Sequence, residues 1–346
     1  MKTLAAILVE TGKPLELGEL EIPSLKAGQV LVKIVYSGAC HTQVLEARGL
    51  RGPDAWLPHC LGHEGTGKVL ETGPGVTKVK PDDQVVLSWI KGSGMEAGGT
   101  VYSWDGRSVN SGGVTTFAQY AVASENRLLS LPIGLDMRHA VILGCSLPTG
   151  MGAVINSGNV QPGESIAVFG SGGIGTCAIL GANAAGGTPV IAIDINTSKL
   201  DLARRCGATH CIDASKRNVV EAIKDICPNG VDLAVEATGV PAVMAQALTC
   251  VRAQGGRAVV VGNAAHGETL EINPRFFNDG KSLLGSWGGD SQPDRDYPRI
   301  ARMMVQGRID ATPLLSAPYR LTDINDALDD LEAGRVGRPL IDMTLD

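Results

Sequence analysis

The feature that most constrains the fold is a stretch from Glu164 to Asp194 with no charged residue between its two ends. An apolar run at 165–170 leads into a glycine turn, and a second apolar run at 189–193 ends directly before Asp194. Such runs are typical of strands buried on both faces of a parallel sheet. The stretch therefore predicts a strand, a tight turn, a helix and a second strand, which together form one βαβ unit.

The glycine turn, Gly170-Ser171-Gly172-Gly173-Ile174-Gly175, has the spacing GxGxxG. The first glycine allows a tight turn, the second lets the backbone approach a pyrophosphate, and the third lets the helix pack closely on the strand. The N–H groups at the start of that helix would face the phosphates. The alternative is a tight turn without a ligand. The predicted coenzyme contacts in the turn are Gly170, Gly172, Gly173, Ile174 and Gly175.

Asp194 stands close to the separation at which an acidic residue accepts the adenosine ribose hydroxyls of a dinucleotide. A carboxylate there would repel the 2′-phosphate of NADP, and no arginine follows it immediately. The predicted coenzyme is therefore NAD rather than NADP.

Length and charge restrict the class of protein. The 346 residues exceed the usual size of a single core, so two domains are expected. A net charge of −6 without basic blocks argues against nucleic acid or an anionic membrane as partner. The N-terminal segment has no cleavage site, so we expect a first strand and a cytoplasmic location. The eight cysteines form no CxxC pair, which favours free thiols or metal ligands over disulfides.

The chain changes character part-way along. Up to about Ser130, short apolar runs between glycine and proline turns predict a mostly antiparallel β domain, with a glycine-rich loop at 91–113 that has room for one hairpin. From 165 onward strands and helices alternate, which predicts a doubly wound parallel sheet. The fold class is thus α/β. We place the β-rich catalytic domain at 1–147 and 288–346, and the dinucleotide-binding domain at 148–287.

Four residues of the first domain have side chains that suit a metal site: Cys40, His63, Glu64 and Cys145. No pair among them has a zinc-finger spacing. Two thiolates and one imidazole can hold Zn²⁺ and leave the fourth tetrahedral position for water or substrate, as in catalytic zinc sites. Taken singly, each cysteine could equally be a small buried hydrophobic residue, and the histidine a core residue.

The combination of motifs resembles the zinc-dependent medium-chain alcohol dehydrogenases over nearly the whole chain. The matching segments are CHT at 40–42, GHEGTGKVLETGPGV at 62–76, LGCSLPTG at 143–150, VFGSGGIG at 168–175 and IAIDINTSK at 191–199. The resemblance implies a Rossmann domain and a GroES-like β domain in a homo-oligomer, dimer or tetramer. It implies one catalytic zinc on Cys40, His63 and Cys145. Glu64 would take a coordination place when water or substrate exchanges, or otherwise form a salt bridge.

The resemblance assigns roles to further residues, each with a simpler alternative. Thr42 would exchange the alcohol proton, or only cap a helix. His41 would carry that proton onward or contact pyrophosphate, or it would be an exposed residue without a role in the reaction. Arg338 would bind pyrophosphate, or form a surface salt bridge. The remaining implied contacts are Lys199, Val261 and Ser286 for the coenzyme, and Leu45, Trp89 and Phe117 for the substrate. Lys199 could instead be a solvated residue in the first turn of a helix, Val261 could simply belong to a buried strand, and either aromatic residue could equally belong to the core.

Two departures from the family pattern change the expectations. Family members commonly carry four closely spaced cysteines for a structural zinc, where this chain has the cysteine-free loop 91–113. We therefore expect one zinc per subunit and no structural zinc. Gln43 and Leu45 stand where the family often has an acidic residue and a histidine, so the proton would leave through His41 or water.

The predicted function is NAD-linked, zinc-dependent oxidation of a primary or secondary alcohol, or the reverse reduction, with zinc as Lewis acid and nicotinamide as hydride carrier. One alternative is a polyol, sugar or cyclitol dehydrogenase. A second is a zinc-free, NADPH-dependent enone or quinone reductase on the same fold. A third is a catalytically silent NAD-binding protein. The sequence names no particular substrate.

Overall fold

The computed structural model describes residues 1–345, and the chain forms two compact units. The first unit comprises Met1–Cys145, Gln292–Val305 and the chain from Leu315 onward, and the second comprises Ser146–Ser291 and Gln306–Leu314. The observed boundaries at 145 and 291 lie two and four residues from the predicted ones at 147 and 287. Residues 306–314 belong to the second unit, whereas the predicted boundaries place them in the catalytic domain.

Part of the first unit is a small closed barrel with the strand order β1-β2-β7-β8-β4. Its strands are β1 (Lys2–Leu8), β2 (Glu16–Glu21), β4 (His59–Cys60), β7 (Val101–Trp104) and β8 (Arg107–Asn110). Strands β7 and β8 form an antiparallel hairpin within the glycine-rich loop, which confirms the hairpin expected there. Turn residues at 105–106, including Gly106 with a φ of +81°, close that hairpin.

The larger part of the first unit is a seven-stranded sheet ordered β10-β6-β5-β3-β18-β17, with β9 also paired to β3. The strands are β3 (Gln29–Gly38), β5 (Glu64–Thr72), β6 (Gln84–Ser88), β9 (Tyr120–Ser124), β10 (Leu128–Ser130), β17 (Leu315–Tyr319) and β18 (Arg338–Asp342). On β3, Val32 and Ile34 are buried in the main core cluster while Lys33 between them is exposed. This alternation fixes which face of the strand packs inward.

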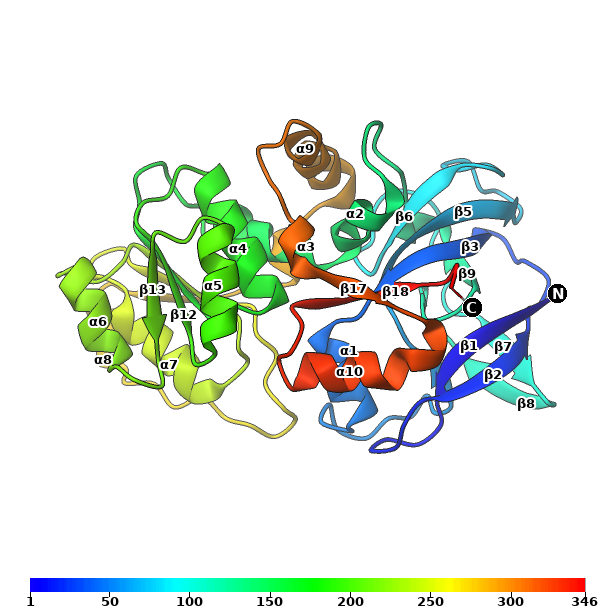
Figure 1. Ribbon diagram of the computed structural model, residues 1–346, viewed down its shortest axis with the longest axis horizontal. Coiled ribbons are helices and arrows are strands. Elements are labelled where there is room, and N and C mark those ends of the chain that lie inside the picture. Colours follow the sequence, from blue (N-terminus) through cyan, green and yellow to red (C-terminus); the bar gives the residue numbers. More distant parts are fainter. Residues whose placement is uncertain (346) are drawn as a thin grey trace. The chain divides into compact units, whose positions relative to one another are not determined.

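Four α-helices flank these strands in the first unit: α1 (His41–Ala47), α2 (Met137–Ala140), α9 (Pro293–Val305) and α10 (Ile324–Glu332). Helices α1 and α10 lie side by side (Figure 1), and Arg48 forms ion pairs with Asp329 and Glu332. Helix α9 was not predicted, because Pro298 inside it interrupts the helical pattern.

The second unit contains a six-stranded parallel sheet ordered β13-β12-β11-β14-β15-β16. This is the strand order of a Rossmann fold, as predicted. The strands are β11 (Ile166–Phe169), β12 (Val190–Asp194), β13 (His210–Asp213), β14 (Leu233–Glu236), β15 (Arg257–Val260) and β16 (Ser282–Gly285). Sequence reasoning missed β13, an edge strand in which only Ile212 is fully buried, so it lacks the apolar run of its neighbours.

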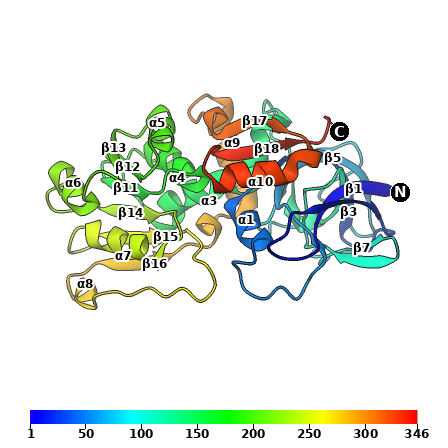
Figure 2. The same cartoon turned by 60° about the horizontal axis from the view of Figure 1, so that its bottom comes forward.

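Helices cover both faces of this sheet. They include α3 (Ser146–Gly152), α4 (Gly173–Ala184), α5 (Thr197–Arg205), α6 (Val219–Ile226), α7 (Pro241–Cys250) and α8 (Arg275–Asn278). Phe169 and Ile191 share a core cluster with residues of α6 and α7. Val168, on the opposite face, lies against Gly175 of α4. Figures 1 and 2 both show α4 and α5 side by side, on one face of the strands.

One further point concerns membranes. No single helix among residues 1–345 is both long and apolar enough to cross a bilayer, although the bent pair Met137–Gly144 and Ser146–Ser157 meets those criteria jointly.

Candidate active site

Cys40, His63 and Cys145 converge in the first unit, with their ligand atoms all within 4.8 Å of one another. The His63 Nε2 lies 3.2 Å from the Cys145 Sγ. Two sulfurs and one imidazole nitrogen are a donor set that zinc prefers, and three protein ligands leave a tetrahedral ion one open position. Residues far apart in sequence thus form the one three-residue metal-ligand cluster of the described chain.

The register of β3 against β5 explains how Cys40 and His63 meet. Ser37 near the end of β3 pairs with Gly65 at the start of β5 in an antiparallel ladder. The chain leaves β3 just before Cys40 and enters β5 just after His63, so both residues lie at the same end of the ladder. The Ser37 hydroxyl donates to the Glu64 carbonyl at 3.1 Å and secures the junction.

Cys145 is held at the same place by the neighbouring strand β6. Ser88, the last residue of β6, pairs with Glu64 and donates its hydroxyl to the Gly144 carbonyl at 2.9 Å. The Tyr297 hydroxyl of α9 lies 2.7 Å from the same serine oxygen. A side chain at position 144 would approach the Leu87 carbonyl to 2.3 Å, so only glycine lets this turn lie on the strand.

The cluster stabilises a thiolate. Hydrogen bonding with Cys145 holds the pKa of Cys40 well below its usual value, burial opposes this, and the charge of Arg338 favours it. The same hydrogen bond, together with burial, raises the pKa of Cys145. Cys60, buried without such partners, has its pKa raised to about 12. The lowered pKa favours a thiolate at Cys40, whereas the raised pKa of Cys60 favours a neutral, inert thiol.

Glu64 and Arg338 form a buried ion pair behind the cluster, with the two residues 0% and 3% exposed. Arg338 begins β18, which pairs with the end of β3 so that Pro339 accepts from the Ala39 N–H at 3.0 Å. A Cβ at position 38 would lie 1.9 Å from the Glu64 Oε1, so Gly38 makes room for the carboxylate.

This pair refines two sequence-based expectations. The Glu64 carboxylate contacts Arg338 and is not a member of the metal-ligand cluster, so the salt-bridge alternative describes the observed structure. The surface salt bridge considered for Arg338 is corrected to a buried one. Its Nη2 has no hydrogen-bond partner within residues 1–345. Coordination by Glu64 during ligand exchange, and pyrophosphate binding by Arg338, stay predictions.

Gln43 links two of the ligands. Its Oε1 accepts from the Cys40 N–H at 2.8 Å, and its Nε2 contacts the His63 Nδ1. The side chain is buried on the first turn of α1 and orients the imidazole so that Nε2 faces the sulfurs. Sequence reasoning identified Gln43 as a departure from the family pattern but not these contacts.

The remaining predicted proton-transfer residues lie on the same helix, α1. Thr42 is half-buried, and its Oγ1 lies 3.8 Å from the Cys40 Sγ, next to the ligand cluster. His41, the first residue of the helix, is exposed. Leu45 is buried on the same helix. Proximity supports Thr42 as a proton-transfer group, while the role of His41 stays a prediction.

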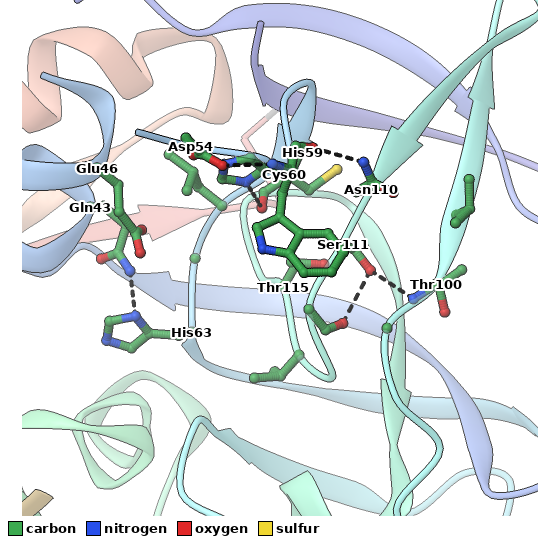
Figure 3. Close-up of a pocket in the computed structure, with 17 residues that line it drawn as sticks. Gln43, Glu46, Asp54, His59, Cys60, His63, Thr100, Asn110, Ser111 and Thr115 are labelled. Atoms are coloured by element: carbon green, nitrogen blue, oxygen red, sulfur yellow. Dashed lines mark hydrogen bonds and ion pairs between the residues drawn. The ribbon is translucent and has the colours of Figure 1, made fainter. Parts of the chain in front are cut away.

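A cavity of about 550 Å³ opens beside the cluster, and His63 is part of its wall (Figure 3). Its lining is mixed polar and apolar, and includes Glu46 and Thr115, which the sequence did not single out. Burial raises the pKa of Glu46, against the effect of the nearby Arg51 charge. A cavity of this size with a few polar groups is typical of a small-molecule site.

The three residues predicted to contact substrate, Leu45, Trp89 and Phe117, lie in different surroundings. The Trp89 ring lies edge-on to His63, with 6.3 Å between ring centroids, so it is next to the cluster. Phe117 is 0% exposed and belongs to the same core cluster as Val32 and Ile34, which favours its alternative as a core residue, and its contact with substrate stays a prediction. Neither these rings nor Leu45 line the cavity beside His63.

The glycine turn of the second unit has the geometry expected of a dinucleotide site. Gly170 has a φ of +86°, which few other residues adopt. A Cβ at Gly175 would lie 1.7 Å from the Gly170 carbonyl oxygen, so α4 packs against this turn at a distance that only glycine allows. A Cβ at Gly172 would meet nothing within 4 Å, so the surface there is open for a ligand to approach. Gly173 and Ile174 begin α4 at this turn.

The other predicted coenzyme residues lie along the carboxyl edge of the same sheet. Asp194 ends β12, and its carboxylate accepts from the Ser171 N–H at 2.7 Å and the Asn196 N–H at 2.9 Å. Val261 and Ser286 directly follow β15 and β16, and Lys199 is half-buried on α5. Dinucleotides bind at this edge of such sheets.

Comparison with known proteins identifies the family. The descriptions "Alcohol dehydrogenase GroES-like domain" and "Zinc-binding dehydrogenase" match residues 26–133 and 173–306. The S-(hydroxymethyl)glutathione dehydrogenases of Escherichia coli and Synechocystis sp. are 34% identical over 99% of this chain and 100% of theirs. The chain belongs to the zinc-dependent medium-chain alcohol dehydrogenases. This alcohol dehydrogenase is therefore an oxidoreductase acting on CH–OH groups.

Solved structures agree with this assignment. An alcohol dehydrogenase zinc-binding domain protein from Burkholderia ambifaria is 32% identical to the dehydrogenase with a TM-score of 0.92. Benzyl alcohol dehydrogenase from Acinetobacter calcoaceticus is 31% identical with a TM-score of 0.90. Each comparison covers 99% of both chains.

One testable consequence concerns Gln43 in the dehydrogenase. Its amide nitrogen can only donate, yet a histidine that ligates through Nε2 carries its proton on Nδ1 and needs an acceptor there. The isosteric change Gln43→Glu supplies that acceptor and keeps an oxygen for the Cys40 N–H. We expect zinc release to a chelator to slow by about tenfold or more. Gln43→Met should accelerate it, and equal release rates in all three proteins would contradict the assignment.

Proposed function

We propose that the dehydrogenase oxidises a primary or secondary alcohol with NAD⁺, or catalyses the reverse reduction, at a zinc ion held by Cys40, His63 and Cys145. The observation that carries the proposal is the three-residue cluster with its 4.8 Å spread. Its donor set fits zinc, and it lies beside a cavity large enough for a small alcohol.

The bound groups supply the reactive chemistry: zinc lowers the pKa of an alcohol hydroxyl, and the nicotinamide ring accepts the hydride. The residues of the chain hold and orient the zinc, the alcohol and the coenzyme. Thr42, next to Cys40, takes the alcohol proton, and with Leu45 unable to pass it on, His41 or water carries it outward. Glu64 and Arg338 keep a balanced pair of charges behind the ligands.

NAD is the proposed coenzyme, and it would bind at the glycine turn with Asp194, Lys199, Val261 and Ser286. Asp194→Asn keeps an acceptor for the Ser171 N–H but removes the charge that meets the ribose hydroxyls. Since hydrogen bonds to charged groups contribute about 1.5–3 kcal/mol, the Kd for NAD⁺ should rise roughly 10- to 100-fold. NADP⁺ should bind better than to the unaltered protein, as titration calorimetry can measure.

The matched control for Asp194→Asn is Asp201→Asn on α5. Asp201 is exposed and pairs with Arg204 on the helix surface. The Asp201→Asn variant should bind NAD⁺ and NADP⁺ with the same affinities as the unaltered protein. A loss of NAD⁺ affinity of the same size in both variants would assign the effect to surface charge and not to ribose recognition.

The function itself is tested by NAD⁺ reduction over a panel of aliphatic, aromatic and polyol alcohols with zinc-loaded protein. Cys40→Ala is the control and should be inactive. Turnover confined to polyols would favour a polyol, sugar or cyclitol dehydrogenase, which the polar residues of the cavity wall also suit. A zinc-free enone or quinone reductase would not need the cluster of Cys40, His63 and Cys145. Metal analysis of the purified protein distinguishes such a reductase from a zinc-dependent dehydrogenase. Absence of NAD⁺ reduction with every alcohol of the panel would indicate a catalytically inactive NAD-binding protein.

The remaining proposals follow the family resemblance. We propose one zinc per chain, because the loop 91–113 carries no cysteine, and metal analysis that finds two would contradict it. A homo-oligomer, dimer or tetramer, and a cytoplasmic location without nucleic-acid or membrane partners also stay predictions.

A further inference from the structure

The cavity beside the ligand cluster has polar groups in its wall. Thr115 lines the cavity and is only 4% exposed. Its hydroxyl can both donate and accept a hydrogen bond. Because His63 also lines this cavity, a molecule bound in it would lie close to the proposed metal ligands (Figure 3).

The same cavity has no cation free to receive an anion. None of its lining residues in the described chain is lysine or arginine. His59 is engaged at both ring nitrogens, because Nε2 lies 2.8 Å from the Asp54 Oδ2 and Nδ1 lies 3.1 Å from the Cys60 carbonyl oxygen. A ligand carboxylate would therefore lose its water of hydration without gaining an ion pair, which is costly.

Glu46 gives the wall an acceptor and a negative charge. It lies on α1 one turn after Gln43, on the same side of the cavity (Figure 3). Its ion-pair partner, Arg51 at 3.3 Å, is 53% exposed and outside the lining. Water and salt screen a pair this exposed, so Arg51 offsets the charge only in part. Glu46 therefore favours hydrogen-bond donors and cations in the cavity.

We propose that this cavity binds the end of the alcohol substrate remote from the reacting carbon, and that it accepts neutral or cationic ends with hydrogen-bond donors while excluding anionic ones. The inference rests on the proposed function, which places the reacting carbon at the cluster. It sets the chain apart from relatives named for S-(hydroxymethyl)glutathione, a substrate that carries carboxylates.

Three alcohols of similar size test the charge preference: benzyl alcohol, 4-(aminomethyl)benzyl alcohol and 4-(hydroxymethyl)benzoate. Their dissociation constants for the zinc-loaded protein are measured by ligand-observed NMR, which does not require turnover. We expect the benzoate to bind at least about tenfold more weakly than benzyl alcohol, and the amine to bind at least as tightly. Added salt should reduce the difference between amine and benzoate.

Variants of the wall then locate the effect. Glu46→Lys should make the benzoate the most tightly bound of the three ligands. Glu46→Gln should reduce the differences between their three dissociation constants. Glu19→Lys makes the same charge change on the exposed strand β2 and should change nothing. Thr115→Val should weaken all three ligands alike.

Two results would overturn the inference: a benzoate that binds the unaltered protein as tightly as benzyl alcohol, or an order of affinities that Glu46→Lys leaves unchanged. Failure of the proposed function is a separate result. It would appear as absence of NAD⁺ reduction with every alcohol, whatever the order of their affinities.

Discussion

Replacing Cys145 with alanine should empty the metal site and lower alcohol oxidation by roughly a thousandfold or more. The variant leaves one thiolate and one imidazole, too few ligands to hold zinc firmly. Loss of the Lewis acid removes several kcal/mol of transition-state stabilisation, and each 1.36 kcal/mol is a factor of ten in rate. Zinc per chain, measured by atomic emission after dialysis, should fall with the activity. Since Cys145 is buried beside Gly144, alanine fits without new contacts.

Cys250→Ala is the matched control for this experiment. Cys250 is also buried, and it belongs to the core of the second unit, outside the metal-ligand cluster. The change should lower stability slightly, as a small cavity does, and should retain both zinc and activity. If Cys145→Ala keeps its zinc, or if Cys250→Ala loses it, the ligand assignment is wrong.

Replacing Arg338 with methionine should destabilise the first unit by about 3–5 kcal/mol, because it leaves the Glu64 carboxylate buried without its countercharge. Methionine fills most of the space of the arginine stem, so the loss is chiefly electrostatic. Denaturant unfolding of zinc-loaded protein measures the effect as a lower midpoint. NAD⁺ affinity of the same variant tests the pyrophosphate role that the family resemblance implies.

The double variant with Glu64→Gln and Arg338→Met separates charge from packing. It removes both charges, so it should be more stable than Arg338→Met alone. Lys2→Ala, which breaks the exposed pair with Glu19, should cost less than about 1 kcal/mol. A midpoint for Arg338→Met equal to that of the unaltered protein would show that the carboxylate finds another partner or takes up a proton.

The parts of the fold that the sequence predicted depend on local patterns. The strand, turn and helix around Gly170 follow from apolar runs and glycine spacing over about a dozen neighbouring residues. The convergence of Cys40 and His63 is different, because it depends on the register of β3 against β5. Composition and spacing left it open, and only the resemblance to a family supplied it.

The parts that sequence reasoning missed depend on tertiary contacts. Nothing near Phe117 in the sequence distinguishes a core aromatic from a substrate contact. Gln43 attracted attention as an unusual residue, but its bond to the Cys40 N–H becomes visible only once the helix begins at His41. Thr115 carries no sequence signal at all, since only the fold places it in the wall of the cavity.

The separation of 274 residues between Glu64 and Arg338 has a consequence for biosynthesis. A nascent chain presents Cys40, His63 and Cys145 early, but the guanidinium that balances the carboxylate behind them is translated only after the whole nucleotide-binding unit. Until β18 emerges and joins β3, the Glu64 carboxylate lacks the countercharge that it has in the folded chain, which disfavours closure of the first unit around it. Metal loading is therefore expected to be a late event in the life of each molecule, after translation has passed residue 338.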